Sequence, residues 1–171
     1  MDILISNAGY GKRIRDIWDI PLEEFDYTIN VNLRATFILV KGVVEGMKKK
    51  EWGRIVTIGS IAAYGAGING AHYAASKGGL VGMSKNLATR LAEFGITVND
   101  VAPAMVESGM MSEDVKVGGE GEEGEPLSKR LGIPVGRLGR AEEVANAVEM
   151  FVKSGYVTGQ SLLVAGGLMH H

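Results

Sequence analysis

The chain has 171 residues, of which 46% are hydrophobic and 22% charged, and this composition is typical of one globular domain with a substantial core. Its net charge of −2 gives no reason to expect nucleic acid, and without cysteine it cannot form disulfides or thiolate metal sites; His72, His170 and His171 do not form a metal cluster. No apolar run could span a bilayer and no signal peptide is recognisable, so we expect a cytoplasmic protein without a membrane contact.

The first part of the chain predicts a strand followed by a long helix. Residues 2–6 form an apolar run that ends at Asn7-Ala8-Gly9. Pro21 suits the first turn of a helix over residues 22–49. Asn32 is an inward amide in that helix and must be hydrogen-bonded. The apolar stripe predicted to face the core is Phe25, Ile29, Leu33, Phe37, Val40 and Val44.

The middle of the chain predicts a second strand and a second long helix. The apolar run 55–58 ends in Gly59-Ser60, which is typical of a buried strand. A loop rich in Gly and Ala leads to a helix over residues 72–94, which Gly95 ends. Tyr73 and Lys77 lie one turn apart on that helix, whose small residues would permit close packing.

The last third predicts two further strands around one helix. Residues 96–101 form a strand that Pro103 and Val106 follow. Residues 113–125 are rich in Gly and Glu and are predicted to be mobile. A helix begins at about Ala141 and ends before Gly155, and residues 161–164 form the final strand.

The residue types at Ser60, Tyr73 and Lys77 suit proton transfer at an oxygen atom. A phenol has a pKa of about 10, and an ammonium group one helical turn away favours the phenolate and lowers that pKa. A serine hydroxyl opposite could hydrogen-bond a carbonyl or alcohol oxygen. Tyrosine and lysine also occur at this spacing on many helices without a function, so the residue types alone leave both interpretations open.

The same residues, with the motifs around them, resemble the short-chain dehydrogenase/reductase family. Ser60, Tyr73 thirteen positions later and Lys77 in Y-A-A-S-K resemble its catalytic core. The resemblance covers essentially the whole chain, in the family's order and approximate spacing. It includes N-A-G at residues 7–9, N-V-N-L with Asn32, V-N-x-V-x-P at residues 98–103, G-R-L-G-R-A-E-E-V-A and Y-V-T-G-Q-S-L-L-V-A-G-G.

The resemblance implies an NAD(P)-dependent oxidoreductase that transfers hydride between nicotinamide and a carbonyl/alcohol pair, close to the 3-oxoacyl-[acyl-carrier-protein] reductases. NADP is the expected cofactor, with NAD possible, and the substrate is a small carbonyl or alcohol molecule. The implied catalytic residues are Asn32, Ser60, Tyr73 and Lys77. The implied cofactor-binding residues are Asn7, Ala8, Gly9, Tyr73, Lys77, Pro103, Val106 and Ser108.

The resemblance also implies the fold. It predicts an α/β architecture, the C-terminal part of a Rossmann-type doubly wound parallel sheet, in which family strands 4-5-6-7 are flanked by helices. Residues 1–171 would form a single truncated Rossmann-like domain with a mobile, lid-like segment at about 109–130. The two long helices of the first half would pair with their copies in a homodimer or homotetramer.

One feature of the family is not found in this sequence. The loop T-G-x-x-x-G-x-G, which cradles the cofactor pyrophosphate, is absent from the 171 residues. Gly65-Ala66-Gly67 and Gly118-Gly119 do not lie between a strand and a helix in the required way. The alternative function is therefore a non-catalytic half-domain that oligomerises without binding nucleotide. A hydrolase is disfavoured because Ser60 lacks a G-x-S-x-G motif.

Overall fold

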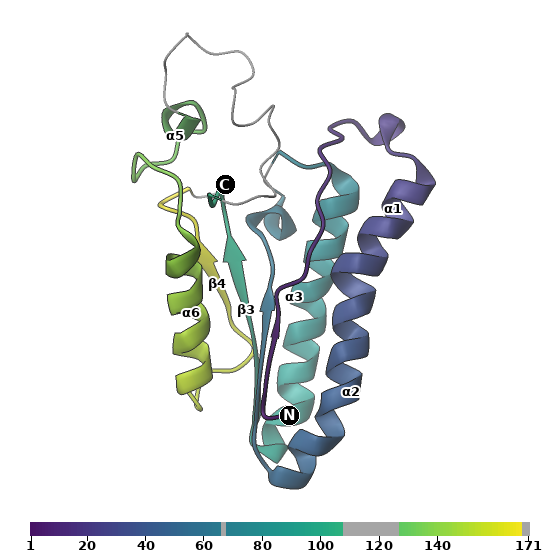
Figure 1. Ribbon diagram of the computed structural model, residues 1–171, viewed down its shortest axis with the longest axis vertical. Helices are drawn as coiled ribbons and strands as arrows, with labels where there is room; N and C mark the ends of the chain where they lie inside the picture. Colours follow the sequence, from purple (N-terminus) through teal and green to yellow (C-terminus); the bar gives the residue numbers. More distant parts are fainter. Residues whose placement is uncertain (66–67, 108–126, 169–171) are drawn as a thin grey trace.

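Four parallel strands form one sheet in the order β1-β2-β3-β4, so that each strand lies beside its neighbour in sequence (Figure 1). The computed structural model describes residues 1–65, 68–107 and 127–168. Leu4 lies opposite Ile55, which in turn lies opposite Val98. The prediction of a Rossmann-like parallel sheet is thus confirmed. The strands are β1 (Ile3–Ser6), β2 (Gly53–Ile58), β3 (Ile96–Pro103) and β4 (Ser161–Val164).

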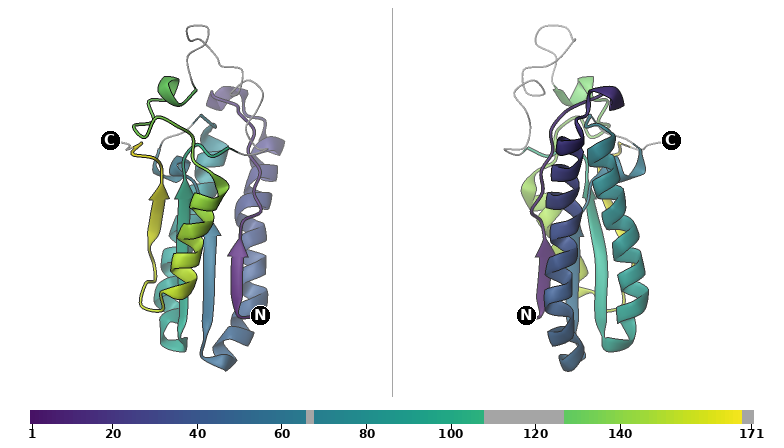
Figure 2. Two further views of the ribbon diagram at one scale, coloured as in Figure 1. Left: turned by 60° about the vertical axis from the view of Figure 1, so that its left-hand side comes forward. Right: turned by 90° about the vertical axis from the view of Figure 1, so that its right-hand side faces the viewer.

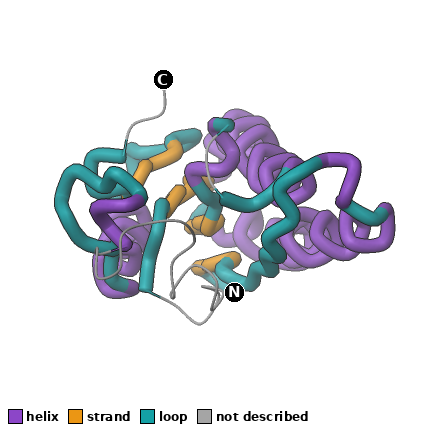
Figure 3. Tube along the Cα trace, turned by 90° about the horizontal axis from the view of Figure 1, so that it is seen from above, coloured by secondary structure: helices purple, strands orange, loops and turns teal. Residues whose placement is uncertain are grey.

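Helices cover both faces of the sheet. Figure 2 shows α6 on one side of the strands and the pair α2 and α3 on the other, and Figure 3 shows the same layers from above. No helix among the described residues is long and apolar enough to cross a membrane. The first long helical segment consists of α1 (Leu22–Ile29), the π-helical turn η2 (Asn30–Arg34) and α2 (Ala35–Lys50). The other long helices are α3 (Ala71–Leu91) and α6 (Ala141–Lys153). Short elements are η1 (Ile17–Asp19), η3 (Ile61–Tyr64), η4 (Ala92–Phe94) and α5 (Leu127–Arg130).

The core is divided by the sheet into two clusters, because successive residues of a strand point to opposite faces. Ile55 and Val98 pack with α2 and α3 on one face. Val56 and Val101 pack against Phe151 of α6 on the other. At the edge strand β1, Leu4 is buried under α2, whereas Ile3 and Ile5 point to the opposite face and remain about 40% exposed. Helix α6 contacts β2, β3 and β4, so it leaves that end of the sheet uncovered.

The first long helix differs from its prediction in two ways. The π-helical turn Asn30–Arg34 interrupts it, and the predicted stripe does not face the core as a whole. Phe25 and Phe37 are 39% and 54% exposed, so their predicted burial is wrong. Val40 of the predicted stripe is buried, as predicted, and it continues a neighbouring line of buried polar residues formed by Thr28, Asn32 and Thr36. Asn32 and Thr36 have hydrogen-bond partners in distant elements, and Thr28 donates to Glu24 one turn earlier in the same helix. These hydrogen bonds offset the cost of burying polar side chains.

Helix α3 depends on one of its small residues for close packing. A Cβ atom at Gly79 would lie 2.6 Å from Cδ2 of Leu33, so the glycine lets the π-helical turn approach α3. At Gly82 no atom lies within 4 Å of such a Cβ, so the predicted role of small residues does not extend to it. Gly95 follows η4 with a φ of +68° and, as predicted, caps the end of this helical segment.

Candidate active site

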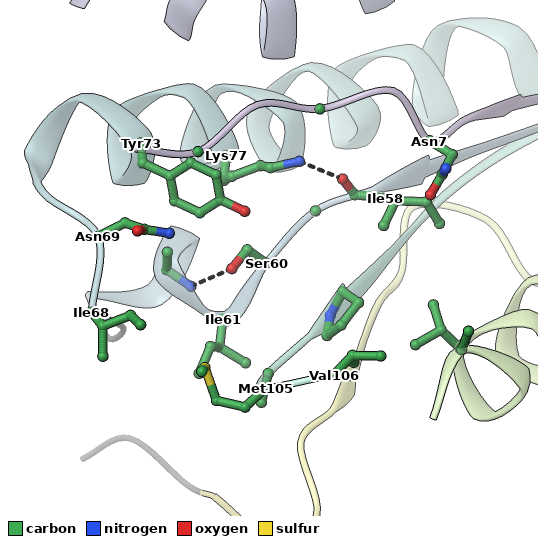
Figure 4. Close-up of a pocket in the computed structure, with 18 of the residues that line it drawn as sticks. Asn7, Ile58, Ser60, Ile61, Ile68, Asn69, Tyr73, Lys77, Met105 and Val106 are labelled. Carbon is green, nitrogen blue, oxygen red and sulfur yellow. Dashed lines mark hydrogen bonds between the residues drawn. The ribbon is translucent and has the colours of Figure 1, made fainter. Parts of the chain in front are cut away.

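The carboxyl ends of β1, β2 and β3 border a cavity of about 640 Å³ (Figure 4). In open parallel sheets, ligands bind outside this end of the strands. The cavity wall contains eight of the ten predicted site residues: Asn7, Ala8 and Gly9 after β1, Ser60 after β2, Tyr73 and Lys77 on α3, and Pro103 and Val106 at the end of β3. Asn32 lies behind the wall, and Ser108 lies outside the described residues.

The hydroxyl groups of Ser60 and Tyr73 come together within this cavity. Ser60 precedes η3 in extended conformation, and its Oγ accepts a hydrogen bond from the N–H of Ala62 over 3.1 Å. Tyr73 lies in the first turn of α3 and is 7% exposed. Figure 4 shows the phenol pointing toward Ser60, whose hydroxyl is close enough to act on the pKa of Tyr73. Two hydroxyl groups therefore converge from β2 and α3 on one point of the cavity.

Lys77 extends from α3 along the inner wall of the cavity. It is 4% exposed, and its Nζ donates to the carbonyl oxygen of Ile58 over 2.8 Å (Figure 4). The same nitrogen lies 5.7 Å from the centre of the Tyr73 ring. Burial lowers the pKa of Lys77 to about 8, although the carboxylate of Asp100 acts in the opposite direction. The amine can therefore change its charge near neutral pH.

The pKa of Tyr73 shifts in the opposite direction to the one predicted from the neighbouring Lys77. Burial raises the pKa of the phenol, and the hydrogen bond from Ser60 lowers it only in part. The residue types predict the opposite direction, because an ammonium at Lys77 should lower this pKa. The Lys77 nitrogen donates instead to the Ile58 carbonyl, and desolvation of the phenol is the larger cause of the shift in its pKa.

Asn32 closes the cavity from behind through three hydrogen bonds. Its Oδ1 accepts from the N–H of Tyr10 over 2.7 Å, and its Nδ2 donates to the Tyr10 carbonyl and to the Ser76 hydroxyl over 2.8 and 2.9 Å. The amide thus ties the loop after β1 to α3. Gly9 in that loop lies beside both Asn32 and Lys77: a Cβ there would be 3.6 Å from Oδ1 of Asn32 and 3.5 Å from Nζ of Lys77.

The π-helical turn sets the position of this amide. The Asn32 carbonyl accepts from the Thr36 hydroxyl over 3.1 Å, and Thr36 is 2.8 Å from the hydroxyl of Ser6 at the end of β1. The turn and the strand are therefore linked just before residues 7–9 enter the cavity. π-Helical turns occur often at functional sites. The sequence indicates the inward amide, whereas the turn itself has no signal in the apolar pattern.

The structure adds lining residues that the sequence did not single out as site residues. Gly11 passes close to Tyr73, where a Cβ would lie 3.2 Å from the phenol ring. The loop after β1 also brings Arg13 to the cavity. Ile68, Asn69 and Met105 complete this side. Their signal was proximity in sequence to Tyr73 and to Pro103, which does not reveal which way a side chain points.

The segment predicted to act as a lid is described only at its end. Residues 108–126 lie outside the described part of the chain, and Leu127–Arg130 form α5. Before it, the end of β3 is fixed to the segment preceding α6: Val106 pairs with Gly139, and the N–H of Glu107 donates to the Gly139 carbonyl over 3.0 Å. These bonds hold one wall of the cavity.

Comparison with known proteins gives consistent relatives. Residues 1–169 match the family model described as enoyl-(acyl carrier protein) reductase. The 3-oxoacyl-[acyl-carrier-protein] reductase FabG of Escherichia coli (strain K12) is 40% identical over 178 residues, which cover 98% of this chain and 66% of the relative. The protein of the same name from Rickettsia bellii is 40% identical over 171 residues, 99% of this chain and 68% of the relative. The chain thus spans about two thirds of the length of these relatives.

Solved structures agree with the sequence relatives. A 3-oxoacyl-[acyl-carrier protein] reductase from Brucella melitensis, solved with bound NAD, superposes with a TM-score of 0.86 and 29% identity over 100% of this chain and 63% of that one. A second structure of a 3-oxoacyl-[acyl-carrier protein] reductase, from Brucella melitensis ATCC 23457, gives the same TM-score and identity over 64% of its length. The family model, the curated relatives, the solved structures and the motifs around the cavity all agree on one assignment. The chain therefore belongs to the short-chain dehydrogenase/reductase family, and its relatives there are of the 3-oxoacyl-[acyl-carrier-protein] reductase type.

Proposed function

We propose that this protein is an NADP-dependent reductase that converts a 3-oxoacyl thioester or a similar small carbonyl compound into the alcohol. The observation that carries the proposal is the convergence of the Ser60 and Tyr73 hydroxyl groups beside Lys77, in a cavity at the carboxyl edge of the sheet. Two hydrogen-bond donors at one point suit a carbonyl oxygen that becomes an alkoxide as hydride arrives at its carbon. The names of the relatives supply the substrate class.

Each residue has a role that follows from its chemistry. Ser60 donates a hydrogen bond to the substrate oxygen, and Tyr73 gives that oxygen its proton. Lys77, as an ammonium, stabilises the phenolate that Tyr73 then becomes and binds hydroxyl groups of the cofactor ribose. Asn32 holds the loop beside Lys77 and organises the path by which the proton of Tyr73 is replaced. A bound nicotinamide would supply the hydride.

The residues around the cavity fit the nicotinamide half of such a cofactor. Lys77 and Tyr73 present an amine and a hydroxyl group for a ribose, and Pro103 and Val106 form an apolar wall. Gly9 leaves the space beside Lys77 open, since a side chain there would lie against its Nζ. Asn7 and Ala8 border the same space and, with Ser108, are proposed as further contacts. The donor set contains hydroxyl, amide and amine groups, as a ribose and a carboxamide require.

The preference for NADP over NAD is the finer part of this proposal. It is supported by the resemblance to 3-oxoacyl-[acyl-carrier-protein] reductases, while one of the solved relatives was crystallised with NAD. The two cofactors differ by a phosphate on the adenosine ribose, and titration with NADPH and NADH in parallel measures the preference directly. Tighter binding of NADH would overturn the choice of NADP without affecting the catalytic assignment.

The experiment that tests the function uses the purified chain in two steps. Quenching of intrinsic tryptophan and tyrosine fluorescence first measures NADPH binding, and oxidation of NADPH with a 3-oxoacyl thioester then measures turnover. An enoyl thioester is the matched control, because it lacks the carbonyl at carbon 3 on which Ser60 and Tyr73 are proposed to act. Turnover of the oxo compound supports the proposal. Absence of NADPH binding at millimolar concentration favours the alternative of a non-catalytic half-domain.

We further propose that the protein forms a homodimer or homotetramer through its first long helices. Phe37, Ile38 and Leu39 on α2 are 54%, 50% and 46% exposed, a run of large apolar side chains that solvent rarely faces in monomers. Light scattering of the wild type against Phe37→Glu tests the proposal. A mass that falls toward the monomer in the variant supports it, and a wild-type monomer overturns it.

A further inference from the structure

A carboxylate is buried in the sheet directly below the proposed active site. Asp100 of β3 is 1% exposed. It points to the face of the sheet that α3 covers, the same face as Ile96 and Val98, because every second residue of a strand lies on one face. An apolar side chain would be expected there, because a buried charge is costly unless it is paired and hydrogen-bonded. In the motif V-N-x-V-x-P at residues 98–103, Asp100 is the first x, so the family resemblance assigns it no role.

The carboxylate is held by donors from both neighbouring strands. The hydroxyl of Thr57 on β2 donates to Oδ1 over 2.7 Å, and the hydroxyl of Ser161 on β4 donates to Oδ2 over 2.6 Å. Thr57 also lies 3.2 Å from the hydroxyl of Ser84 on α3. A Cβ atom at Gly59 would be 2.6 Å from Oδ1, so the chain after β2 closes tightly over the carboxylate. Asp100 of β3 thus links the end of β2 to the start of β4.

The charges of Asp100 and Lys77 each act on the pKa of the other residue. The carboxylate raises the pKa of Lys77 against the larger effect of burial, and Lys77 contributes to lowering the pKa of Asp100 against its own burial. The remaining groups that face the pair are the phenol of Tyr73 and the neutral hydroxyls of Thr57, Ser84 and Ser161. Within the described residues, no other charge is a cause of either shift.

The same carboxylate braces the segment that Lys77 and the substrate contact. Asp100 binds Thr57 and packs against Gly59, and the residue between them, Ile58, offers its carbonyl to the Lys77 nitrogen. Ser60 follows immediately. A shift of this segment would therefore move the acceptor of Lys77 and the hydroxyl of Ser60 together.

We propose that Asp100 is a positioning residue of the active site: its buried carboxylate, bound by Thr57 and Ser161, fixes the end of β2, where the Ile58 carbonyl binds the Lys77 nitrogen, and with it the adjoining Ser60. The inference rests on the proposed function in that Lys77 acts there as a cation. It adds a residue outside the cavity wall that acts on the site through Lys77 and the end of β2.

The test measures the protonation of Lys77 without using activity. The wild-type chain of residues 1–171, Asp100→Asn and the surface control Glu93→Gln are labelled with trace acetic anhydride at a series of pH values. Mass spectrometry follows the Lys77 peptide relative to the exposed Lys41 in the same sample. In Asp100→Asn we expect the labelling midpoint of Lys77 to move to lower pH and the labelling at neutral pH to be several times faster. Glu93→Gln should match the wild type.

A second variant keeps the test decisive if Asp100→Asn does not fold. Thr57→Val combined with Ser161→Ala retains the carboxyl group but removes both hydroxyl donors, which lower its pKa. The weakened anion should shift Lys77 in the same direction by a smaller amount. An unchanged Lys77 midpoint in the folded variants overturns the inference. The wild type is also tested for NADPH binding. If the wild type binds no NADPH while the Lys77 midpoint still shifts in the variants, the inference stands and the proposed function is overturned.

Discussion

The nitrogen of Lys77 donates to the carbonyl oxygen of Ile58 over 2.8 Å, and this bond joins α3 to the last residue of β2. The consequence is that the lysine side chain lies across the strand end and below Tyr73, within reach of a ribose in the cavity. The bond also accounts for the position of an amine in a largely buried site, because a backbone carbonyl replaces part of its lost hydration.

Removal of the phenol oxygen should abolish most of the reductase activity. Tyr73→Phe keeps the ring and its packing, so kcat is expected to fall by about 10²–10⁴-fold while NADPH affinity changes little. Steady-state kinetics and fluorescence titration measure the two quantities. Tyr64→Phe is the matched control, since Tyr64 is 43% exposed in η3. Equal activity in both variants would exclude Tyr73 as the proton donor.

Loss of the Ser60 hydroxyl should change both rate and pH dependence. The hydrogen bond from Ser60 lowers the pKa of Tyr73, so Ser60→Ala raises that pKa further. On the alkaline side of the pH–rate profile Lys77, with its pKa of about 8, loses its proton first. The later step, at which the phenol loses its proton, should move to higher pH, and kcat should fall by about 10²-fold. Ser154→Ala at the distant end of α6 serves as the control. If the phenol loses its proton at the same pH in Ser60→Ala as in the wild type, then Ser60 does not lower the pKa of Tyr73.

Lys77 should make stability depend on pH in a defined window. Its pKa falls from the ordinary 10.5 to about 8 on burial, so between these values the unfolded chain binds more protons than the folded one. Stability therefore rises with pH from about 8 to 10.5, by up to about 3 kcal/mol from this group, and Lys77 adds no slope below about 8.

Urea unfolding at several pH values, with Lys77→Met as the comparison, measures this effect. The rise between pH 8 and 10.5 should be smaller in Lys77→Met, whereas Lys41→Met on the exposed face of α2 should retain it. The same rise in both variants would show that other groups produce it.

The buried amide of Asn32 should contribute strongly to stability. Asn32→Ala removes three hydrogen bonds and leaves the N–H and carbonyl of Tyr10 without their partner. The free energy of unfolding should fall by about 2–4 kcal/mol. Asn30→Ala in the same π-helical turn is the matched control, because Asn30 is exposed and should change stability by about 0.5 kcal/mol or less. If both variants lose a comparable free energy of unfolding, the loss comes from disturbing the π-helical turn and not from the hydrogen bonds of Asn32.

Two glycines with different surroundings should respond in opposite directions to alanine. At Gly59 the new methyl group would meet the Asp100 carboxylate at 2.6 Å, and overpacking of this kind costs about 1–3 kcal/mol. At Gly82 the methyl group meets open space within a helix, so alanine should stabilise by up to about 1 kcal/mol. Thermal and urea unfolding of the two variants measure the difference. A neutral Gly59→Ala would mean that the strand end can yield.

The sequence predicted the local structure and the membership of the site. The apolar runs before Asn7, Ser60 and Pro103 indicated strands, and the sheet places all three ends on one edge because parallel strands share direction. Tyr73 and Lys77 could be placed on one helix face because helical spacing alone fixes that relation. Resemblance then supplied roles that residue types left open.

What the tertiary structure decided depends on partners far apart in sequence. Phe37 faces solvent while Thr36 is buried, since the hydroxyl of Thr36 meets Ser6 thirty positions away. Asp100 can occupy a core position because Thr57 and Ser161 reach it from neighbouring strands. Periodicity records which positions are apolar. It does not record which polar groups find a partner once the strands are paired, and that pairing decides which polar side chains can be buried.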